Sequence, residues 1–346
     1  MKQMGKKTVK ILLFIAIGIF LFLTTDQVLR VKSSKGLDHY YELQRNSVDV
    51  LFVGSSHVYR NINPAVLFEK EGIAAYNLGT ASQPVWNSYH YIVEALKTQK
   101  PKVIVLEAYK VAVDDEYADS ATTVKALSGM RYSKNRMDVV VASVENPEEW
   151  IGYFLGLPMY HSRYGELTIE DYNRNYGNEY YDSFLGYMPI ADSVECDIPE
   201  QIGEIKKVRS LSEKNREYLD RIVELAEKEE IQLLFLITPF CKYAVKKQAY
   251  YNDLERYAQE KGIPCLNGNL YYAEIGLDGK TDFGKGNHLS HSGADKFSAF
   301  LCKYLKDHYT LEDHRNDPDY GLWQENVNLL SGEAGVNMDF GDNDME

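Results

Sequence analysis

The chain alternates between short, unbroken apolar runs and longer stretches in which apolar residues recur at helical spacing. The apolar runs lack the polar alternation of a strand with one wet face, so they predict buried parallel strands. In chain order these runs are residues 48–53, 74–79, 103–106, 232–238 and 263–266.

Amphipathic helices are predicted between these strands and after the last one. The apolar stripe that begins at Val85 predicts a helix over 85–96, and residues 246–261 predict another. Ser210 opens a capping-box pattern, and Ser292 is predicted to cap the last helix. This strand–helix alternation predicts a three-layer α/β fold with a doubly wound parallel sheet.

The strand–helix rhythm is interrupted from residue 111 to 208, after the third strand. This insertion has several possible helices and a dense group of tyrosines, of which the whole chain has 27. Because it leaves the carboxyl end of a strand, we expect it to cover the reactive edge of the sheet as a lid or substrate wall. The tyrosines of this group are Tyr153, Tyr160, Tyr164, Tyr172, Tyr176, Tyr180, Tyr181 and Tyr187.

The N-terminal segment is apolar and follows a lysine-rich start. Residues 11–25 carry no charge, and four lysines precede them. This run fits the core of a signal peptide or a slightly thin membrane helix. No small-x-small cleavage site follows, so we favour an uncleaved signal anchor over residues 1–29, with the lysines inside. We therefore expect a single-pass protein of the cell membrane with an extracytoplasmic body.

The formal net charge of −13 is concentrated near the C-terminal end. Residues 311–346 hold ten acidic residues against Arg315, which places −9 there and −4 on the rest of the chain. Without a domain-wide basic excess, nucleic-acid binding is disfavoured. We expect a globular body over 30–310 and an acidic flexible tail over 311–346, which either solvates the protein or faces a basic partner.

The four cysteines are widely spaced and form no Cys-x-x-Cys pair. They are Cys196, Cys241, Cys265 and Cys302. This spacing supports no zinc site, and we expect neither a metal nor a cofactor. Outside the membrane the cysteines could pair in any of three connectivities, and unpaired buried thiols fit the sequence equally well.

The first predicted strand ends in Gly54-Ser55-Ser56-His57. Glycine allows a sharp turn at the carboxyl end of the strand, where open α/β sheets place their reactive groups. A serine on such a turn is a candidate nucleophile, and His288, in a glycine-rich loop before the last helix, is a candidate base. A phosphate-binding loop fits less well, because the Gly-x-x-x-x-Gly-Lys spacing is absent.

Together these residues resemble the SGNH/GDSL hydrolase superfamily. Its Gly-Asp-Ser-Leu-type block aligns with residues 54–57, which implies that Ser56 is the nucleophile and that Ser55 replaces the aspartate. His288 is followed five residues later by Gly293, as in the last block of the family, which implies that His288 is the base.

The resemblance extends to Asn77-Leu78-Gly79, which is similar to the second block of the family. It implies an oxyanion hole formed by the backbone N–H groups of Ser56 and Gly79, a flavodoxin-like SGNH fold, and an acyl-Ser56 intermediate. The chain would then be an ester hydrolase or an O-acyltransferase.

Two positions depart from the family pattern. Lys285 stands where the family has the aspartate that orients the histidine, so either Asp282 takes that role, or Ser56 and His288 act as a dyad, or catalysis is weak. The Gly-x-Asn-Asp block after the third strand is also missing, and Glu107 stands there.

Three roles fit Glu107. It could face the substrate, hold a cation such as Arg131, or serve as an ordinary hydrogen-bonding residue at the end of a strand. The third donor of the oxyanion hole is left unassigned.

The anchor and the Gly-Ser-Ser turn resemble a membrane-tethered subgroup that includes alginate O-acetyltransferase-like proteins and the protein serving D-alanylation of lipoteichoic acid. This implies action on acyl, above all acetyl, esters of a cell-envelope polysaccharide, beside a multispanning membrane-bound O-acyltransferase. The alternative is a catalytically weak protein that binds a glycan or such an acyltransferase, with Lys285 marking a decayed site.

Further side chains are candidates for substrate contact. Ser55 and His57 flank the nucleophile, and the segment 160–164 in the insertion would suit a carbohydrate wall. Within that segment His161 is a polar contact, and Arg163 is available for an anionic group.

Overall fold

The computed structural model describes residues 2–30, 37–167, 169–172 and 184–330. Five parallel strands form one sheet in the order β2-β1-β3-β4-β5, which confirms the predicted α/β class and its doubly wound sheet. Every residue of the first three strands is buried, as their unbroken apolar runs require. The strands are β1 Val50–Gly54, β2 Ala75–Gly79, β3 Val103–Glu107, β4 Gln232–Ile237 and β5 Cys265–Asn267.

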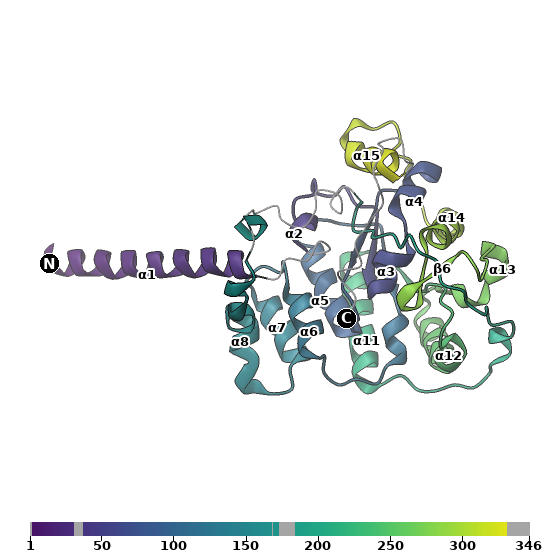
Figure 1. Ribbon diagram of the computed structural model, residues 1–346, viewed down its shortest axis with the longest axis horizontal. Helices are drawn as coiled ribbons and strands as arrows, with labels where there is room; N and C mark the ends of the chain where they lie inside the picture. Colours follow the sequence, from purple (N-terminus) through teal and green to yellow (C-terminus); the bar gives the residue numbers. More distant parts are fainter. Residues whose placement is uncertain (1, 31–36, 168, 173–183, 331–346) are drawn as a thin grey trace.

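Helices cover both faces of the sheet (Figure 1). One face carries α3 (Ser56–Asn61), α4 (Pro64–Glu71) and α14 (His291–His308), which pack on one another. The other face carries α5, α11 and α12. Helix α11 packs on α5, and Tyr257 of α12 donates a hydrogen bond to Asp220 of α11 at 2.9 Å. Their bounds are α5 Val85–Ala95, α11 Glu213–Glu229 and α12 Ala244–Lys261.

The helices of the insertion thicken one helical layer and do not cover the reactive edge, so the predicted lid is wrong for them. Helix α7 (Lys134–Ser143) packs on α5, where the Trp86 Nε1 atom donates to Ser143 Oγ at 3.1 Å. Val139 and Val140 are fully buried, and this apolar side is covered by packing against the body. The neighbouring helices are α6 Ser120–Leu127, α8 Trp150–Leu155 and α9 Leu157–Tyr160.

The last part of the insertion does reach the reactive edge. The backbone N–H of Met188 donates to Tyr59 O at 2.7 Å, and that of His291 donates to Ile190 O at 2.8 Å. These bonds hold residues 184–190 across α3 and the start of α14. Of the predicted tyrosine group, Tyr176, Tyr180 and Tyr181 lie outside the described residues.

Helix α1 (Lys2–Leu29) projects from the body, at the side formed by α8 (Figure 1). Within the described residues, Lys6–Leu29 is long and apolar enough to cross a membrane. This finding fits an anchor and a signal sequence alike.

The predicted flexible tail is wrong for residues 311–330, which fold back onto the body. Helix α15 (Gly321–Leu330) packs on α4, and Trp323 Nε1 donates to Ala75 O of β2 at 2.9 Å. The buried His314 lies 2.8 Å from the Asp49 carboxylate. These buried aromatic contacts outweigh the acidic composition that suggested a tail. Residues 331–346 lie outside the described part.

Two predicted caps are displaced by two residues. Ser212, rather than Ser210, caps α11, and Ser290, rather than Ser292, caps α14 by accepting from the N–H of Gly293 at 3.3 Å. Sequence patterns locate a helix end only to within a residue or two. The other short elements are α2 Leu37–Tyr40, α13 Tyr272–Ile275, and the antiparallel pair β6 Phe283–Gly284 and β7 His288–Leu289.

Candidate active site

Ser56 is the first residue of α3, directly after the turn that ends β1. The turn needs Gly54, because a Cβ atom there would lie 2.6 Å from the Cβ of Glu107 on the neighbouring strand. Ser55 caps the helix, with its hydroxyl accepting from the N–H of His57 at 3.4 Å. The structure thus places the Ser56 hydroxyl at the predicted edge of the sheet.

The two residues predicted as nucleophile and base lie together, although 232 positions separate them. His288 Nε2 is 2.8 Å from Ser56 Oγ. The other ring nitrogen, Nδ1, is 3.1 Å from the backbone carbonyl oxygen of Lys285. A proton on Nδ1 satisfies that carbonyl and leaves the Nε2 lone pair to accept from the serine. The main chain of Lys285 therefore stands in the direction where the family has a carboxylate.

Asn61, which the sequence analysis did not single out, connects the helix of Ser56 to the loop of His288. Its Oδ1 accepts from the N–H of Leu289 at 2.9 Å. Its Nδ2 faces Thr238 Oγ1 at 2.8 Å and His57 Nδ1 at 3.1 Å. No spacing rule predicts this bridge, because two of its partners, Thr238 and Leu289, come from segments far away in the sequence.

Asp282, which the sequence offered as the orienting acid, is placed in a different network. Its carboxylate accepts from Lys296 Nζ at 2.5 Å, from Ser292 Oγ at 2.8 Å and from the N–H of Asp278 at 2.7 Å. The side chain is buried at the start of α14. These contacts make Asp282 a clamp for that helix end, so its assignment as the orienting acid is corrected.

Gly79, the other predicted oxyanion residue, lies opposite Gly54 in the β1–β2 register. A Cβ atom at Gly79 would come within 2.5 Å of Gly54 O, so only glycine lets this backbone approach the Ser56 turn. Asn77, from the same block, instead donates to the carbonyl oxygens of Val58 and Ile62 and fixes the far end of α3.

Glu107 supports the nucleophile turn from below. Its Oε2 accepts from the hydroxyl of Ser55 at 2.7 Å and from the N–H of Ser55 at 3.2 Å, and Oε1 accepts from the N–H of Tyr109 at 2.7 Å. Burial raises the pKa of this carboxyl to about 7, against the lowering effect of these bonds and of Lys247. The predicted pairing with Arg131 is wrong, since that guanidinium lies over a tyrosine ring elsewhere.

His57 is buried in an aromatic stack beside the candidate base. Its ring lies 4.0 Å from that of Tyr109 and 4.9 Å from that of His288, measured between centroids. Lys247, on α12, holds its Nζ atom 4.2 Å from the centroid of the Tyr109 ring. Burial, His288 and Lys247 lower the pKa of His57 well below its usual range, so it is neutral. His57 is therefore a packing residue next to the base and not an exposed substrate contact.

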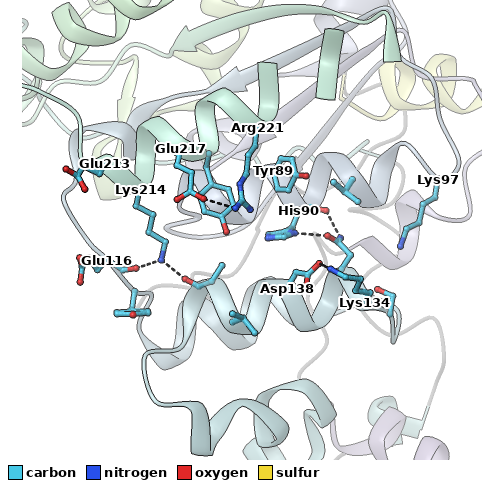
Figure 2. A pocket seen from close by; sticks show the side chains of 17 residues that line it. Tyr89, His90, Lys97, Glu116, Lys134, Asp138, Glu213, Lys214, Glu217 and Arg221 are labelled. Carbon is cyan, nitrogen blue, oxygen red and sulfur yellow. Dashed lines mark hydrogen bonds and ion pairs between the residues drawn. The ribbon is translucent and has the colours of Figure 1, made fainter. Parts of the chain in front are cut away.

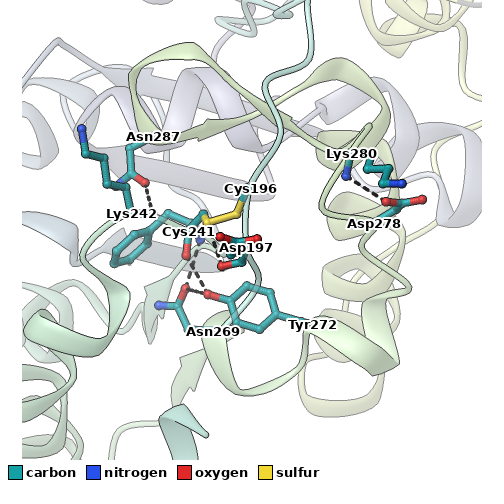
Figure 3. Close-up of a disulfide and its surroundings, with 10 residues drawn as sticks. Cys196, Asp197, Cys241, Lys242, Asn269, Tyr272, Asp278, Lys280 and Asn287 are labelled. Carbon is teal, nitrogen blue, oxygen red and sulfur yellow. Dashed lines mark hydrogen bonds between the residues drawn. A yellow bond between two sulfur atoms is a disulfide. The ribbon is translucent and has the colours of Figure 1, made fainter. Parts of the chain in front are cut away.

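A disulfide fastens the loop after β4 near this edge. Cys196 and Cys241 are bonded, with Cα atoms 6.3 Å apart (Figure 3). The next residue, Lys242, donates its backbone N–H to Asn287 Oδ1 at 2.6 Å, immediately before His288. The disulfide thus stabilises a neighbour of the histidine loop, whereas Cys265 and Cys302 are free thiols.

Two predicted substrate contacts lie at the other side of the body. Arg163 donates to the carbonyl oxygens of Leu29 and Arg30, both at 2.8 Å, and pairs with Asp171 at 2.9 Å. His161 is exposed and lies 2.8 Å from Pro158 O by its Nδ1 atom. Arg163 is therefore a cap for the end of α1, and the predicted carbohydrate wall is not part of this site.

A hollow of about 1230 Å³ lies elsewhere on the described part of the body, and neither Ser56 nor His288 lines it. It is an open groove between α5, α7 and α11 (Figure 2). Its charged groups pair within the groove: Lys214 donates to the carbonyl oxygens of Glu116 and Ala142, and other side chains form ion pairs along the helices. In the part of the chain that the structure describes, no cluster of histidine, cysteine or carboxylate groups could hold a metal ion.

No family model and no curated protein sequence matches the chain. Solved structures that are similar to it include the following two. One, from Desulfitobacterium hafniense DCB-2, is described as a lipolytic protein of the G-D-S-L family; it is 15% identical, covers 75% of this chain and 100% of its own, and has a TM-score of 0.37. The other, from Bacteroides fragilis NCTC 9343, is described as an acylhydrolase; it is 13% identical, covers 86% of this chain and 94% of its own, and has a TM-score of 0.30. At such TM-scores the fold assignment depends on the sheet order of this chain itself.

Proposed function

We propose that this protein is a membrane-anchored, extracytoplasmic serine esterase or acyltransferase that works through an acyl-Ser56 intermediate. The observation that carries the proposal is the 2.8 Å contact between His288 Nε2 and Ser56 Oγ at the carboxyl edge of a doubly wound sheet. A nucleophile within hydrogen-bond reach of a base is the arrangement that covalent acyl transfer requires.

The reaction proceeds in two halves. His288 accepts the hydroxyl proton while Ser56 Oγ attacks the ester carbonyl, and the oxyanion is held by the backbone N–H groups of Ser56 and Gly79, each donor being worth about 3–4 kcal/mol in comparable sites. The tetrahedral intermediate expels the alcohol, which takes the proton from His288. A hydroxyl of water or of a sugar then attacks the acyl-enzyme while His288 takes its proton. The second tetrahedral intermediate collapses with cleavage of the bond to Ser56, and Ser56 Oγ regains that proton from His288.

The position of the Lys285 carbonyl supports a working dyad over a decayed site. It accepts from Nδ1–H and so selects the tautomer in which Nε2 is a base. A carbonyl oxygen at this position stabilises the imidazolium less than a carboxylate would.

The substrate class follows from the resemblance together with the location. Helix α1 can span a membrane, and the disulfide suits an oxidising compartment. We propose acyl, above all acetyl, esters of a cell-envelope polysaccharide as substrates and a multispanning membrane-bound O-acyltransferase as the partner that supplies the acyl group.

The test is covalent trapping in the full-length protein in detergent. A fluorophosphonate should add one mass adduct to Ser56, absent from Ser56→Ala and His288→Ala but present in Ser120→Ala, an exposed serine on α6. We expect His288→Ala to lower hydrolysis of an activated acetyl ester by about 10⁴-fold. With an oligosaccharide added, acetylated sugar indicates transfer and free acetate indicates hydrolysis. Folded protein without an adduct would instead favour the non-catalytic, glycan- or acyltransferase-binding alternative.

A further inference from the structure

The end of α1 is fixed to the body rather than joined to it by a free linker. The Arg163 guanidinium caps the carbonyl oxygens of Leu29 and Arg30, the last residues of the helix. One turn earlier, Asp26 is only 1% exposed and accepts from Arg30 at 2.8 Å. Helix α1 also packs on α9 and on the 3₁₀ turns His161–Gly165 and Ile169–Tyr172. The direction of α1 therefore fixes the orientation of the body.

The uncharged part of α1 is short for a bilayer. Residues 11–25 form 15 positions, which at 1.5 Å each span about 22 Å, whereas the hydrocarbon layer is about 30 Å thick. At the N-terminal end lysines can extend to the headgroups. At the other end the Asp26 side chain is buried against the body, so it cannot extend to the headgroups as the lysines do. The difference between the length of the uncharged segment and the thickness of the hydrocarbon layer is relieved at this end if the body itself enters the membrane–water interface.

Exposed apolar and aromatic side chains lie on the elements that contact this end of α1 or pack beside those elements. We call them the apolar rim: Tyr132, Ile151, Met159, Tyr164 and Tyr172, with exposed fractions from 36% to 76%. They belong to the turn before α7, to α8, to α9 and to the two 3₁₀ turns, and α8 lies at the side of the body from which α1 leaves (Figure 1). Tyrosine is the residue type that membrane interfaces favour, because its ring is apolar and its hydroxyl is wet.

We propose that the apolar rim is seated in the headgroup layer of the lipid bilayer that α1 crosses. This inference rests on the membrane anchoring in the proposed function. The lipid interface is the occupant because the rim is continuous with the membrane helix and because it makes up the missing length of that helix. Seating the rim holds the edge with Ser56 at a constant height and angle above the membrane.

The test uses the full-length chain in phosphatidylcholine liposomes, with Cys265→Ala and Cys302→Ala as background. Single cysteines at three exposed positions carry an environment-sensitive fluorophore: Phe14→Cys on α1, Ile151→Cys on the rim, and Val245→Cys on α12 as the matched control. Lipids with a nitroxide at the headgroup or along the acyl chain serve as quenchers. Tyr164→Cys is a second rim position in case Ile151→Cys folds poorly.

We expect a blue shift and loss of emission at position 14 with acyl-chain nitroxides, and at position 151 with headgroup nitroxides. Position 245 should keep the emission that it has in water. If position 14 is quenched while 151 and 164 behave like 245, the body stands clear of the bilayer and the proposal fails, although the anchor remains. If position 14 is also unquenched, or if mass spectrometry shows that α1 has been removed from the chain, the membrane anchoring in the proposed function is wrong, and the seating of the rim is wrong with it.

Discussion

The Glu107 carboxylate lies beneath the nucleophile turn and accepts both the hydroxyl and the backbone N–H of Ser55, at 2.7 and 3.2 Å. Ser55 precedes Ser56, the candidate nucleophile, and caps the helix that begins there. A buried acid thus sets the geometry of the turn from which Ser56 projects, where the family pattern has an aspartate in the turn itself.

Glu107→Gln should weaken catalysis. If the side-chain NH₂ of the glutamine takes the place of Oε2, the hydroxyl and the backbone N–H of Ser55 lose their acceptor. The loss of a hydrogen bond to a buried charged group, about 1–3 kcal/mol, corresponds to roughly a tenfold lower kcat/KM. Ester hydrolysis measured beside Glu94→Gln, a buried glutamate on α5, checks this. Equal activity of the two variants would contradict a role for Glu107 in the turn.

The same carboxyl makes stability depend on pH. Its pKa is about 7 in the folded protein and near 4.5 when exposed, so the folded state holds the proton more tightly. The free energy of unfolding contributed by Glu107 is therefore largest below pH 4.5 and falls as pH rises towards 7. Urea unfolding between pH 4.5 and 7.5 should show a flatter profile in Glu107→Gln than in the wild type. Parallel profiles would exclude the raised pKa.

Lys247 tunes this carboxyl from the far side of Tyr109. Its charge lowers the pKa of Glu107, while burial and Lys110 lower the pKa of Lys247 to about 8. Lys247→Met should raise the pKa of Glu107 in the folded protein by up to about one unit, so the loss of stability with rising pH should extend to a higher pH by the same amount. The exposed Lys246→Met is the control, and an unchanged pKa in both would show that the two groups do not interact.

Asp282→Asn separates a structural clamp from a catalytic acid. We expect a loss of about 1–3 kcal/mol in stability, since three hydrogen bonds at the start of α14 are weakened, with kcat nearly unchanged. Loss of a triad acid would instead lower kcat about 10⁴-fold. The control is Asp253→Asn, at a second buried aspartate, which pairs with Arg216 and Arg256. It should lower the melting temperature without changing kcat.

The Cys196–Cys241 disulfide should contribute about 4 kcal/mol to stability, given the 45-residue separation that it closes. Cys196→Ser with Cys241→Ser, compared with Cys302→Ala in thermal unfolding, measures this contribution. We also expect a lower kcat, because the loop at Lys242 contacts Asn287 beside His288. Wild-type protein under reducing conditions should match the double variant.

The sequence by itself determined the layers of the fold, and it placed a candidate nucleophile and a candidate base at the boundaries of predicted elements. Unbroken apolar runs have few alternatives to a buried parallel strand, and helical stripes must face a sheet. Ser56 and His288 were candidates because each stands near a glycine at the boundary of a predicted element, and the structure brings the two side chains within 2.8 Å. The hydrophobic period and local turn chemistry are short-range properties, which a single chain displays directly.

Only the tertiary structure decided which groups contact these residues. Asp282 and the Lys285 carbonyl are both close to His288 in sequence, but packing of α14 turns the carboxylate towards Lys296 and leaves the carbonyl facing the imidazole. The charge of Arg163 predicted a contact with an anionic substrate, whereas in the structure its guanidinium donates to the carbonyl oxygens of Leu29 and Arg30 at the end of α1. Such pairings depend on where separate elements meet, and residue type and local spacing do not encode that position.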